Sequence, residues 1–599
     1  MTSITKLRVG DEDFLVASMI ERCPKSMMLR ELVKNALEAA SLAKPGQRLV
    51  EIGAVTIEGV RKLRLWNTGP GLDAAELHSM CDIASSVGKM QGLDRNFGMG
   101  AKVATLPSNH LGVRYRSCKN GRVSEVTIGK RDGVYGRVLR KDPAGGSMVA
   151  VADVTKQVRD AGMDMSRDWT EVTLLGDRAD QDTVADPYDG NPRMPRTWVL
   201  RELQHRFFRI GDDVRLMLAP EVTAAPRTRA FIPLANHMAQ NFAQWEAVEL
   251  PDGIVARFGY DPAHPSLPGR NASFIDRLSP DISFAGLVHD DEFYDFRTGT
   301  RWTQEAPGFG ISFGARHLSV VVELPKGYPV RPEGYRQFLR YLNGAQDQVR
   351  LVDFAAMVRA RRPGWVRDLV QSLSPDLDLL DNVNEQLRKL IAELGITRKR
   401  PVVRRPPPAK DAVRGVVQDE ADAAARPQQK AAETPPPKQE ADGTAVGEIE
   451  DYEAIPEFLL LRSEDEIADR NLTYRAARFY PETHQIYVNL RYPSVMRMAD
   501  ALSATAPAAV PVVRAQTVAL AVAEHILILR LGQALVYGLS KRDATKGWTP
   551  AEKLQATSSE MLTLMAENLP TAMLEARQMF EERLADKKGA VPEPDVGEE

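Results

Sequence analysis

The chain has 599 residues, which is too long for one compact core, so its length predicts two to four domains. Its 78 basic and 81 acidic residues give a formal net charge of −3, so binding to nucleic acid or to anionic membranes would need a local patch. The three cysteines have no metal-ligand spacing and are too few for a disulfide framework. Because the N-terminus also lacks a signal-peptide pattern, we expect a cytoplasmic protein.

The first helical pattern spans residues 26 to 43 and contains the sequence MLRELVKNALEAA. Positions four apart lie on one face of a helix, so Glu31 and Asn35 should point the same way, while leucines, valine and alanines cover much of the rest. An exposed polar stripe would explain this pair on its own. The segments that follow favour a shared functional target instead.

Three short segments come next. The strand-like residues 49 to 66 run into Asn67-Thr68-Gly69-Pro70-Gly71, residues 96 to 106 read NFGMGAKVATL, and residues 168 to 176 read DWTEVTLLG. In the second segment, glycines let backbone N–H groups approach a polyphosphate, and a helix start and a lysine add positive charge. Each fragment is common alone, but the ordered set is specific.

The same region alternates short strand-like runs, from 111 to 175, with helical patterns at 73 to 86 and 100 to 106. A sheet covered by helices on one face is the natural packing for such a mixture. The following stretch repeats the mixture, with TWVLRELQHRFFRIG helical and HLSVVVELP a strand, and predicts a second α+β domain.

A Pro-, Ala- and charge-rich stretch with almost no aromatic residues then predicts a disordered linker. Beyond it, a short sheet followed by helices is expected, and the apolar run from 515 to 538 favours a buried amphipathic helix over a membrane span because charged side chains interrupt it. The predicted boundaries are residues 1–195 for the first domain, 196–393 for the second, 394–455 for the linker, 456–585 for a mostly helical C-terminal α+β domain and 586–599 for an acidic tail.

In this order the segments resemble the GHKL ATPases, a family that shares the Bergerat nucleotide fold and includes MutL, MORC proteins, gyrase-type subunits, heat-shock chaperones and histidine kinases. LRELVKNALEA resembles the first family motif, NTGPG the second, FGMGAK the third and TEVTL the fourth. The resemblance covers residues 15 to 176. It implies an α+β fold class: a Bergerat-fold α/β-sandwich ATPase domain, a transducer-like α+β domain, the disordered linker and a small mixed C-terminal domain.

The resemblance also implies roles for individual residues. Glu31 is expected to be the catalytic base that orients the attacking water, and Asn35 to hold Mg²⁺ against the phosphates of ATP. This chemistry needs the two side chains close together, because the metal neutralises phosphate charge while the carboxylate activates water. A lid over the nucleotide is expected at residues 73 to 97, and nucleotide contacts are expected from Asn35, Asn67, Gly69, Gly71, Gly98, Met99, Gly100, Ala101, Lys102 and Thr170.

Two positions depart from the family pattern. Asn67 stands where the family has an aspartate that accepts a hydrogen bond from the adenine amino group. A charge-assisted hydrogen bond contributes about 1.5–3 kcal/mol against about 0.5–1.5 kcal/mol for a neutral one, so adenine affinity is expected to fall roughly tenfold, with guanine as an alternative base. Trp169 stands where the family has a glycine, which leaves the base contact of Thr170 open.

The second domain resembles the transducer domain of MutL, MORC and gyrase-type members, in which a basic residue after a strand reaches the terminal phosphate. Lys326 is the expected catalytic residue of this kind, with Arg331 close behind, although two solvated basic residues in a turn would look the same. A candidate DNA-binding arm, or else a solvated charge run, lies in the linker at Arg398, Lys399, Arg400, Arg404, Arg405 and Lys410.

These features favour a Mg²⁺-dependent ATPase that works as a nucleotide-gated clamp. It would form a nucleotide-dependent homodimer, act on DNA in a MORC- or MutL-like way and contact protein partners through its C-terminal domain, with no membrane partner. The alternatives are a chaperone-like clamp on polypeptide and a scaffold that senses nucleotide without hydrolysing it. A sensor histidine kinase is disfavoured because no histidine precedes His78, and a topoisomerase or endonuclease because no cleaving tyrosine or metal cluster is evident.

Overall fold

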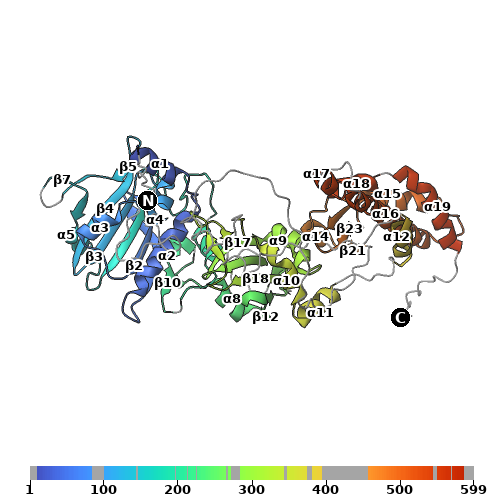
Figure 1. Ribbon diagram of the computed structural model, residues 1–599, viewed down its shortest axis with the longest axis horizontal. Coiled ribbons are helices and arrows are strands. Elements are labelled where there is room, and N and C mark those ends of the chain that lie inside the picture. The colour runs from blue at the N-terminus through green and yellow to red at the C-terminus, as the bar shows by residue number, and fades with distance from the viewer. Residues whose placement is uncertain are drawn as a thin grey trace, which may run out of the picture.

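The computed structural model contains three domains in a row along its long axis, with the second between the other two (Figure 1). The protein is of the α+β class, as its sequence predicts. The structure describes residues 10–83, 100–142, 146–195, 197–211, 213–223, 225–264, 267–271, 283–342, 347–373, 381–393, 456–543, 550–567 and 569–585.

A mixed sheet forms the centre of the first domain. Among the described residues its strands follow the order β11-β10-β1-β2-β9-β3-β4-β5, with β8 beside β4. The neighbours are antiparallel except β1 and β10, which are parallel. The strands are β1 (Leu49–Ile57), β2 (Val60–Thr68), β3 (Val113–Lys119), β4 (Arg122–Arg131), β5 (Val134–Arg137), β8 (Val151–Asp153), β9 (Trp169–Leu174), β10 (Arg215–Leu218) and β11 (Arg229–Ala230), and a separate ribbon pairs β6 (Arg140–Lys141) with β7 (Met148–Val149).

One face of this sheet is covered by α2 (Met27–Ser41) and neighbouring helices, and the short α5 packs on the other. The apolar side of α2 buries Leu32 and Val33 in one core with Ile52 and Leu65 of the sheet. Each such side chain contributes about 1.5–3 kcal/mol when it leaves water, so this face holds α2 firmly in place. The helices of the domain are α1 (Glu12–Glu21), α2 (Met27–Ser41), α3 (Ala74–Met80), α4 (Gly100–Thr105), α5 (Thr155–Asp160), α6 (Trp198–Arg206) and α7 (Pro220–Thr223).

The first domain extends beyond residue 195. Strand β10 pairs with β1, and α6 buries Trp198 and Leu203 in the same core as α2. The core continues to Phe231, so the predicted boundary between residues 195 and 196 is wrong. The sequence did not reveal this because a short helix and strand look alike on either side of a domain junction.

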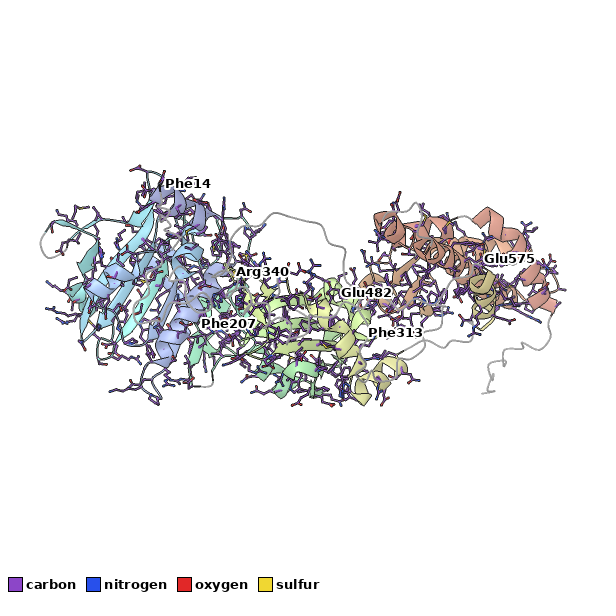
Figure 2. All side chains as sticks on the ribbon, in the orientation of Figure 1. Phe14, Phe207, Phe313, Arg340, Glu482 and Glu575 are labelled. Carbon is purple, nitrogen blue, oxygen red and sulfur yellow. The ribbon has the colours of Figure 1, made fainter. Side chains whose placement is uncertain are left out.

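The second domain has a sheet in the order β12-β13-β18-β16-β17. Strands β16 and β18 are parallel, so they end at the same edge, where His289 lies opposite Leu324. This edge meets the first domain: the backbone N–H of Phe208 donates to the carbonyl of Asp291 at 2.9 Å, and Figure 2 labels Phe207 at this junction. The elements are α8 (Leu234–Asn241), β12 (Gln244–Glu249), β13 (Val255–Tyr260), β14 (Ala263–His264), β15 (Leu267–Asn271), β16 (Phe284–His289), β17 (Glu292–Thr298), α9 (Gly299–Glu305), β18 (Leu318–Leu324), β19 (Val330–Pro332), β20 (Leu339–Tyr341), α10 (Ala355–Ala360) and α11 (Gly364–Ser372).

The C-terminal domain combines the three strands of a sheet ordered β21-β23-β22 with a group of helices. It contacts the second domain through Phe313, which packs against Leu459 and Leu461 and is labelled at that junction in Figure 2. The elements are α12 (Asp381–Glu393), β21 (Glu457–Leu461), α14 (Glu464–Asp469), β22 (Ala477–Tyr480), β23 (Gln485–Asn489), α15 (Pro493–Ser503), α16 (Val512–Asp543), α17 (Pro550–Gln555), α18 (Ser559–Ala566) and α19 (Leu569–Ala585).

Helix α12 belongs to the C-terminal domain. Its Val383 and Leu387 are fully buried in one core with α15, α16 and α19. The prediction that the second domain runs to residue 393 is therefore wrong. The predicted linker and acidic tail lie outside the described residues.

Within the described part of the chain, α16 alone is long and apolar enough, by length and composition, to cross a membrane. In the structure, 56% of its apolar window is buried, and the helix packs against α12, α15, α18 and α19. Its Glu524 is buried, and each of its two carboxylate oxygens accepts a hydrogen bond from the Arg462 guanidinium. The helix is thus the centre of the C-terminal core.

The extended boundary predicts how fragments behave. A fragment of residues 1–231 is expected to fold, whereas a fragment of residues 1–195 should not. Loss of Trp198, Leu200 and Leu203 removes about 1.5–3 kcal/mol for each buried side chain, which together approaches the whole stability of a domain. Thermal unfolding followed by circular dichroism checks this, and equal midpoints for the two fragments would contradict it.

Candidate functional site

The four motif segments converge at one end of the first domain's sheet. A Cβ atom added to Gly100 would lie 2.0 Å from Oε2 of Glu31, so the third segment touches the first. The register of the sheet sets Asn67 of the second segment directly opposite Thr170 of the fourth. Gly69 of the second segment also lies against Ala39 of α2, the helix that carries Glu31, so α2 and the sheet connect segments more than a hundred positions apart in the sequence.

The first segment lies on α2 and presents two polar side chains there. The Glu31 side chain is 12% exposed and contacts the start of α4, where Gly100 leaves room for it. Asn35, one turn later on the same helix, is exposed. The carboxylate is thus partly shielded from water, while the amide is open to solvent.

The sheet contributes a row of three polar side chains. Asn67 on β2, Thr170 on β9 and Ser117 on β3 are neighbours in register, and the hydroxyls of Ser117 and Thr170 lie 2.9 Å apart. Two residues along each strand, Leu65 and Val172 lie in the core beneath the helices. Because every second residue of a strand shares a face, the polar row faces the helices and closes the floor of the region.

The sequence alone did not point to Ser117. Its hydroxyl accepts a hydrogen bond from the Leu72 backbone N–H at 2.8 Å and donates to the Trp169 carbonyl at 3.0 Å, so it also joins the second segment to the sheet. The strand VRYRSCK gave no signal, because the register between β3 and β9 is a property of the folded sheet.

Asn67 is almost fully buried and has a defined amide partner. Its Nδ2 donates to the Thr68 carbonyl at 2.9 Å, which leaves Oδ1 as the acceptor that faces away from that bond. An acceptor oxygen is what an adenine amino group requires. Asn67 thus presents one neutral acceptor oxygen.

Trp169 does not fill the region. It lies one residue before Thr170, so its side chain is on the opposite face of the sheet, where it is fully buried with Cys118 and Val123. Its indole N–H donates to the Asp164 carbonyl at 2.8 Å. The indole of Trp169 therefore lies on the other side of the sheet from the Thr170 side chain.

The glycines of the second segment pack against protein backbone. A Cβ at Gly69 would lie 2.8 Å from the Ala39 carbonyl oxygen of α2, and one at Gly71 would lie 2.1 Å from that of Cys118 on β3. Gly71 also has a φ of +61°, which favours glycine. The packing therefore requires glycine at both positions. Their expected contacts with a nucleotide stay predictions.

Lys102 has a structural partner in this conformation. Its ammonium is buried and donates to the carbonyls of Met80, at 2.7 Å, and Asp82 at the end of α3. Burial lowers the pKa of Lys102 to about 8, and the charges of Cys81 and Asp82 partly oppose that effect. A phosphate contact would need the ammonium to leave these carbonyls.

The remaining residues of the third segment divide into two groups. Ala101 is half-buried and packs against the core of the first domain. Gly98 and Met99, and residues 84 to 97 of the expected lid, lie outside the described residues.

A buried ion cluster adjoins Glu31. Arg30 donates to Glu31 and binds Glu292 of the second domain through two hydrogen bonds of 2.8 and 2.7 Å. Arg206 on α6 binds the same Glu292 at 2.8 Å, and Lys34 lies 3.5 Å from it. Arg30 and Lys34 lie within the first segment without an expected role, and Arg206 and Glu292 lie in none of the four segments.

Opposing effects set the ionisation of this cluster. Burial alone would raise the pKa of Glu292, but the charges of Arg206 and Arg30 outweigh it and hold the pKa well below its usual range. Burial alone would lower the pKa of Arg30. The nearby carboxylate of Glu292 outweighs this effect and raises the pKa of Arg30. Both groups are therefore charged at neutral pH.

Lys326, the expected phosphate contact from the second domain, is exposed after β18. The connection between β19 and β20 reaches the first domain through other residues: the Tyr335 hydroxyl donates to the Met19 carbonyl at 3.3 Å, and Arg206 donates to the Arg336 carbonyl at 3.0 Å. Arg331 is half-buried in β19. The catalytic role of Lys326 stays a prediction.

Among the residues that the structure describes, those around Glu31 and Asn35 form no complete metal site by themselves. The described residues contain no group of three or more His, Cys, Asp or Glu side chains able to hold a metal. Mg²⁺ commonly takes only one or two protein ligands and completes its shell with water and substrate phosphates. The amide of Asn35 is exposed and could supply one such ligand, and its magnesium role stays a prediction.

Comparison with known proteins gives no family assignment: no protein-family model matches the chain, and a search of curated proteins finds no match.

The close approach at Gly71 predicts a large cost of substitution. Gly71→Ala and Gly121→Ala both place an alanine at positive φ, which costs about 1–2 kcal/mol. Only the Cβ at position 71 meets a neighbouring atom, so Gly71→Ala should cost about 1–3 kcal/mol more. Urea unfolding of both variants measures the difference, and equal free energies of unfolding would contradict the packing described.

Proposed function

We propose that the protein is a Mg²⁺-dependent ATPase in which the region around Glu31 binds and hydrolyses the nucleotide. The observation that carries the proposal is the convergence of four separate segments at one end of the sheet, with Glu31 against Gly100 and Asn67 opposite Thr170. The resemblance of these segments to the GHKL motifs supports the same conclusion.

In the proposed mechanism, each side chain has a task that its position suits. Glu31 orients the attacking water and accepts its proton. A carboxylate that is partly shielded from bulk solvent suits this role. Asn35 holds Mg²⁺, which supplies positive charge to the phosphates when bound. The purine base of the nucleotide would lie against the polar floor formed by Asn67, Ser117 and Thr170.

We further propose that ATP closes two copies of the chain into a clamp and that hydrolysis reopens it. Nucleotide drives such a change only if it binds the closed state more tightly than the open one. The second domain is suited to transmit the change, because its sheet edge contacts α2 and α6 directly. DNA binding through the basic linker would be strongly salt dependent.

The test of this proposal is nucleotide turnover by wild-type protein and by Glu31→Gln, with Glu38→Gln on the same helix as the matched control. Loss of the base should lower Mg²⁺-dependent turnover at least about a hundredfold, while the control changes little. Turnover of ATP and of GTP identifies the nucleotide substrate, and the same assay with and without DNA tests whether DNA is the client. The mass of the protein in solution, followed in parallel, reports dimerisation.

Each outcome has a distinct meaning. Nucleotide-bound dimers trapped by Glu31→Gln, with DNA-stimulated turnover in the wild type, would support the DNA clamp. Stimulation by unfolded polypeptide instead would favour the chaperone-like alternative. Nucleotide binding without turnover in either protein would overturn the catalytic role of Glu31 and leave a nucleotide-sensing scaffold.

Asn67 predicts a weakened preference for adenine. Asn67→Asp restores a charged acceptor and should tighten ATP binding about tenfold relative to GTP. The same change removes the hydrogen bond to the Thr68 carbonyl, so the variant should also lose about 1 kcal/mol of stability. Titration calorimetry with both nucleotides checks the preference, and an unchanged ATP-to-GTP ratio would place the base elsewhere.

A further inference from the structure

We infer that the turn between α10 and α11 binds the phosphate backbone of duplex DNA through a cluster of arginines. The inference goes beyond the proposed ATPase, because it needs neither nucleotide nor Glu31, and it rests on the proposed function only for the choice of DNA as the partner. The cluster lies on the side of the second domain that faces the C-terminal domain (Figure 1), and its members are Arg359, Arg361, Arg362 and Arg367.

The core of the second domain holds this turn on both sides. Helix α10 ends at Ala360, and α11 begins at Gly364. On either side of the turn, Val358 and Val366 are fully buried in the same core. Pro363 is also buried, and its ring fixes the backbone φ just before α11. The arginines therefore project from a rigid element, so a partner loses less entropy in ordering them.

Hydrogen bonds to carbonyl groups hold two of the arginines in place. The Arg362 guanidinium donates to the carbonyl of Gly310 and, at 3.1 Å, to that of Arg359. Arg359 in turn donates at 3.5 Å to the carbonyl of Glu482 in the C-terminal domain, a residue that Figure 2 labels at the junction. None of these acceptors is a carboxylate, so these bonds fix the two guanidiniums without cancelling their charge.

The other two arginines, Arg361 and Arg367, are exposed. Arg367 folds back over the start of α11, since a Cβ at Gly364 would lie 3.9 Å from its Nη2. Within the described part of the chain, neither arginine forms a salt bridge with a carboxylate, and the exposed Asp368 beside Arg367 pairs with neither. Both side chains are thus available to a partner in solution.

The cluster carries positive charge that the turn itself does not balance. Residues 359 to 368 contain four arginines and a single acidic residue, in a chain whose formal net charge is −3. Burial lowers the pKa of Arg362, and the charges of Arg359 and Arg367 lower it further. Like charges held together in this way repel one another, and an anion bound among them would relieve that repulsion.

The surroundings of the turn favour a phosphate backbone over a peptide or a membrane. Guanidinium groups match phosphate oxygens with paired hydrogen bonds, and phosphate contacts supply most of the affinity in non-specific DNA binding. A peptide or a membrane would also need apolar contacts. Among the described residues of the second domain, Leu373 at the far end of α11 is the one exposed large aliphatic side chain, and the half-buried Trp365 donates its indole N–H to Glu246 at 2.8 Å.

The test is the salt dependence of binding to a short fluorescein-labelled DNA duplex of mixed sequence, followed by fluorescence anisotropy without nucleotide. Each phosphate contact contributes about 0.9 to the slope of log affinity against log salt concentration. Arg361→Gln combined with Arg367→Gln should therefore reduce the steepness of this slope by about 2 and weaken binding about tenfold, whatever the DNA sequence. The basic linker is the same in both proteins, so it does not affect the difference.

Two control variants separate phosphate contact from general charge. Arg301→Gln combined with Arg497→Gln removes the same charge from two exposed arginines that form salt bridges elsewhere, and should leave the slope unchanged. Arg361→Lys combined with Arg367→Lys keeps the charge at the turn and should keep the slope. Thermal unfolding of every variant checks that each one folds.

A footprint on the wild-type protein tests the same contacts without any substitution. Phenylglyoxal modifies accessible arginines, and mass spectrometry identifies the sites. Bound duplex should slow the modification of Arg361 and Arg367 several-fold and leave that of Arg301 unchanged. Equal modification rates with and without DNA at all three positions would contradict the inference.

The outcomes separate the inference from the proposed function. An unchanged slope in the glutamine pair, or an equal loss in the Arg301 and Arg497 control, would overturn the inference and leave the ATPase and its basic linker intact. Equally strong competition by poly-glutamate would also overturn it, in favour of an acidic protein partner. DNA binding that needs the turn, in a protein whose turnover does not need Glu31, would overturn the proposed function and leave the inference standing.

Discussion

The arrangement of the first two domains depends on one buried carboxylate. Removal of a charged Glu292 from water costs several kcal/mol, which only close, hydrogen-bonded cations can offset. These cations are Arg30 and Lys34, from the helix that carries Glu31 and Asn35, and Arg206 from α6. The second domain cannot leave this position without exposing the cluster, so the α2 helix and the second sheet behave as one unit.

The two faces of the first sheet divide packing from chemistry. Beneath the helices, apolar residues give way at one end to the polar row of Asn67, Thr170 and Ser117. The opposite face pairs arginines with buried carboxylates across strands, as where Arg116 binds Glu125 at 2.5 Å. The same face also carries an apolar cluster in which Trp169 and Cys118 pack against Val158 of α5. The strands can therefore hold a polar site on the helical side without losing their core.

Much of this was accessible from the sequence. The 3.6-residue pattern of α2, the strand before Gly69, the helix after Gly71 and the buried α16 follow from local periodicity, which the packing preserves. Ser117 and Glu292 were not accessible, because cross-strand register and the partner of a buried charge arise only in the tertiary structure. Both domain boundaries were missed for a related reason: β10 and α12 complete cores whose other parts lie far along the chain.

The place of α12 also affects how the chain responds to cutting. Residues 394 to 455 join two elements of a single core, since α12 precedes this segment and α16 follows it. A protease that cut anywhere in the segment would leave α12 packed against α16, and the two pieces would stay together without a covalent bond. Because α12 and α16 are held together by packing, a change in the length or sequence of the segment would leave the C-terminal fold and its contact with Phe313 in place.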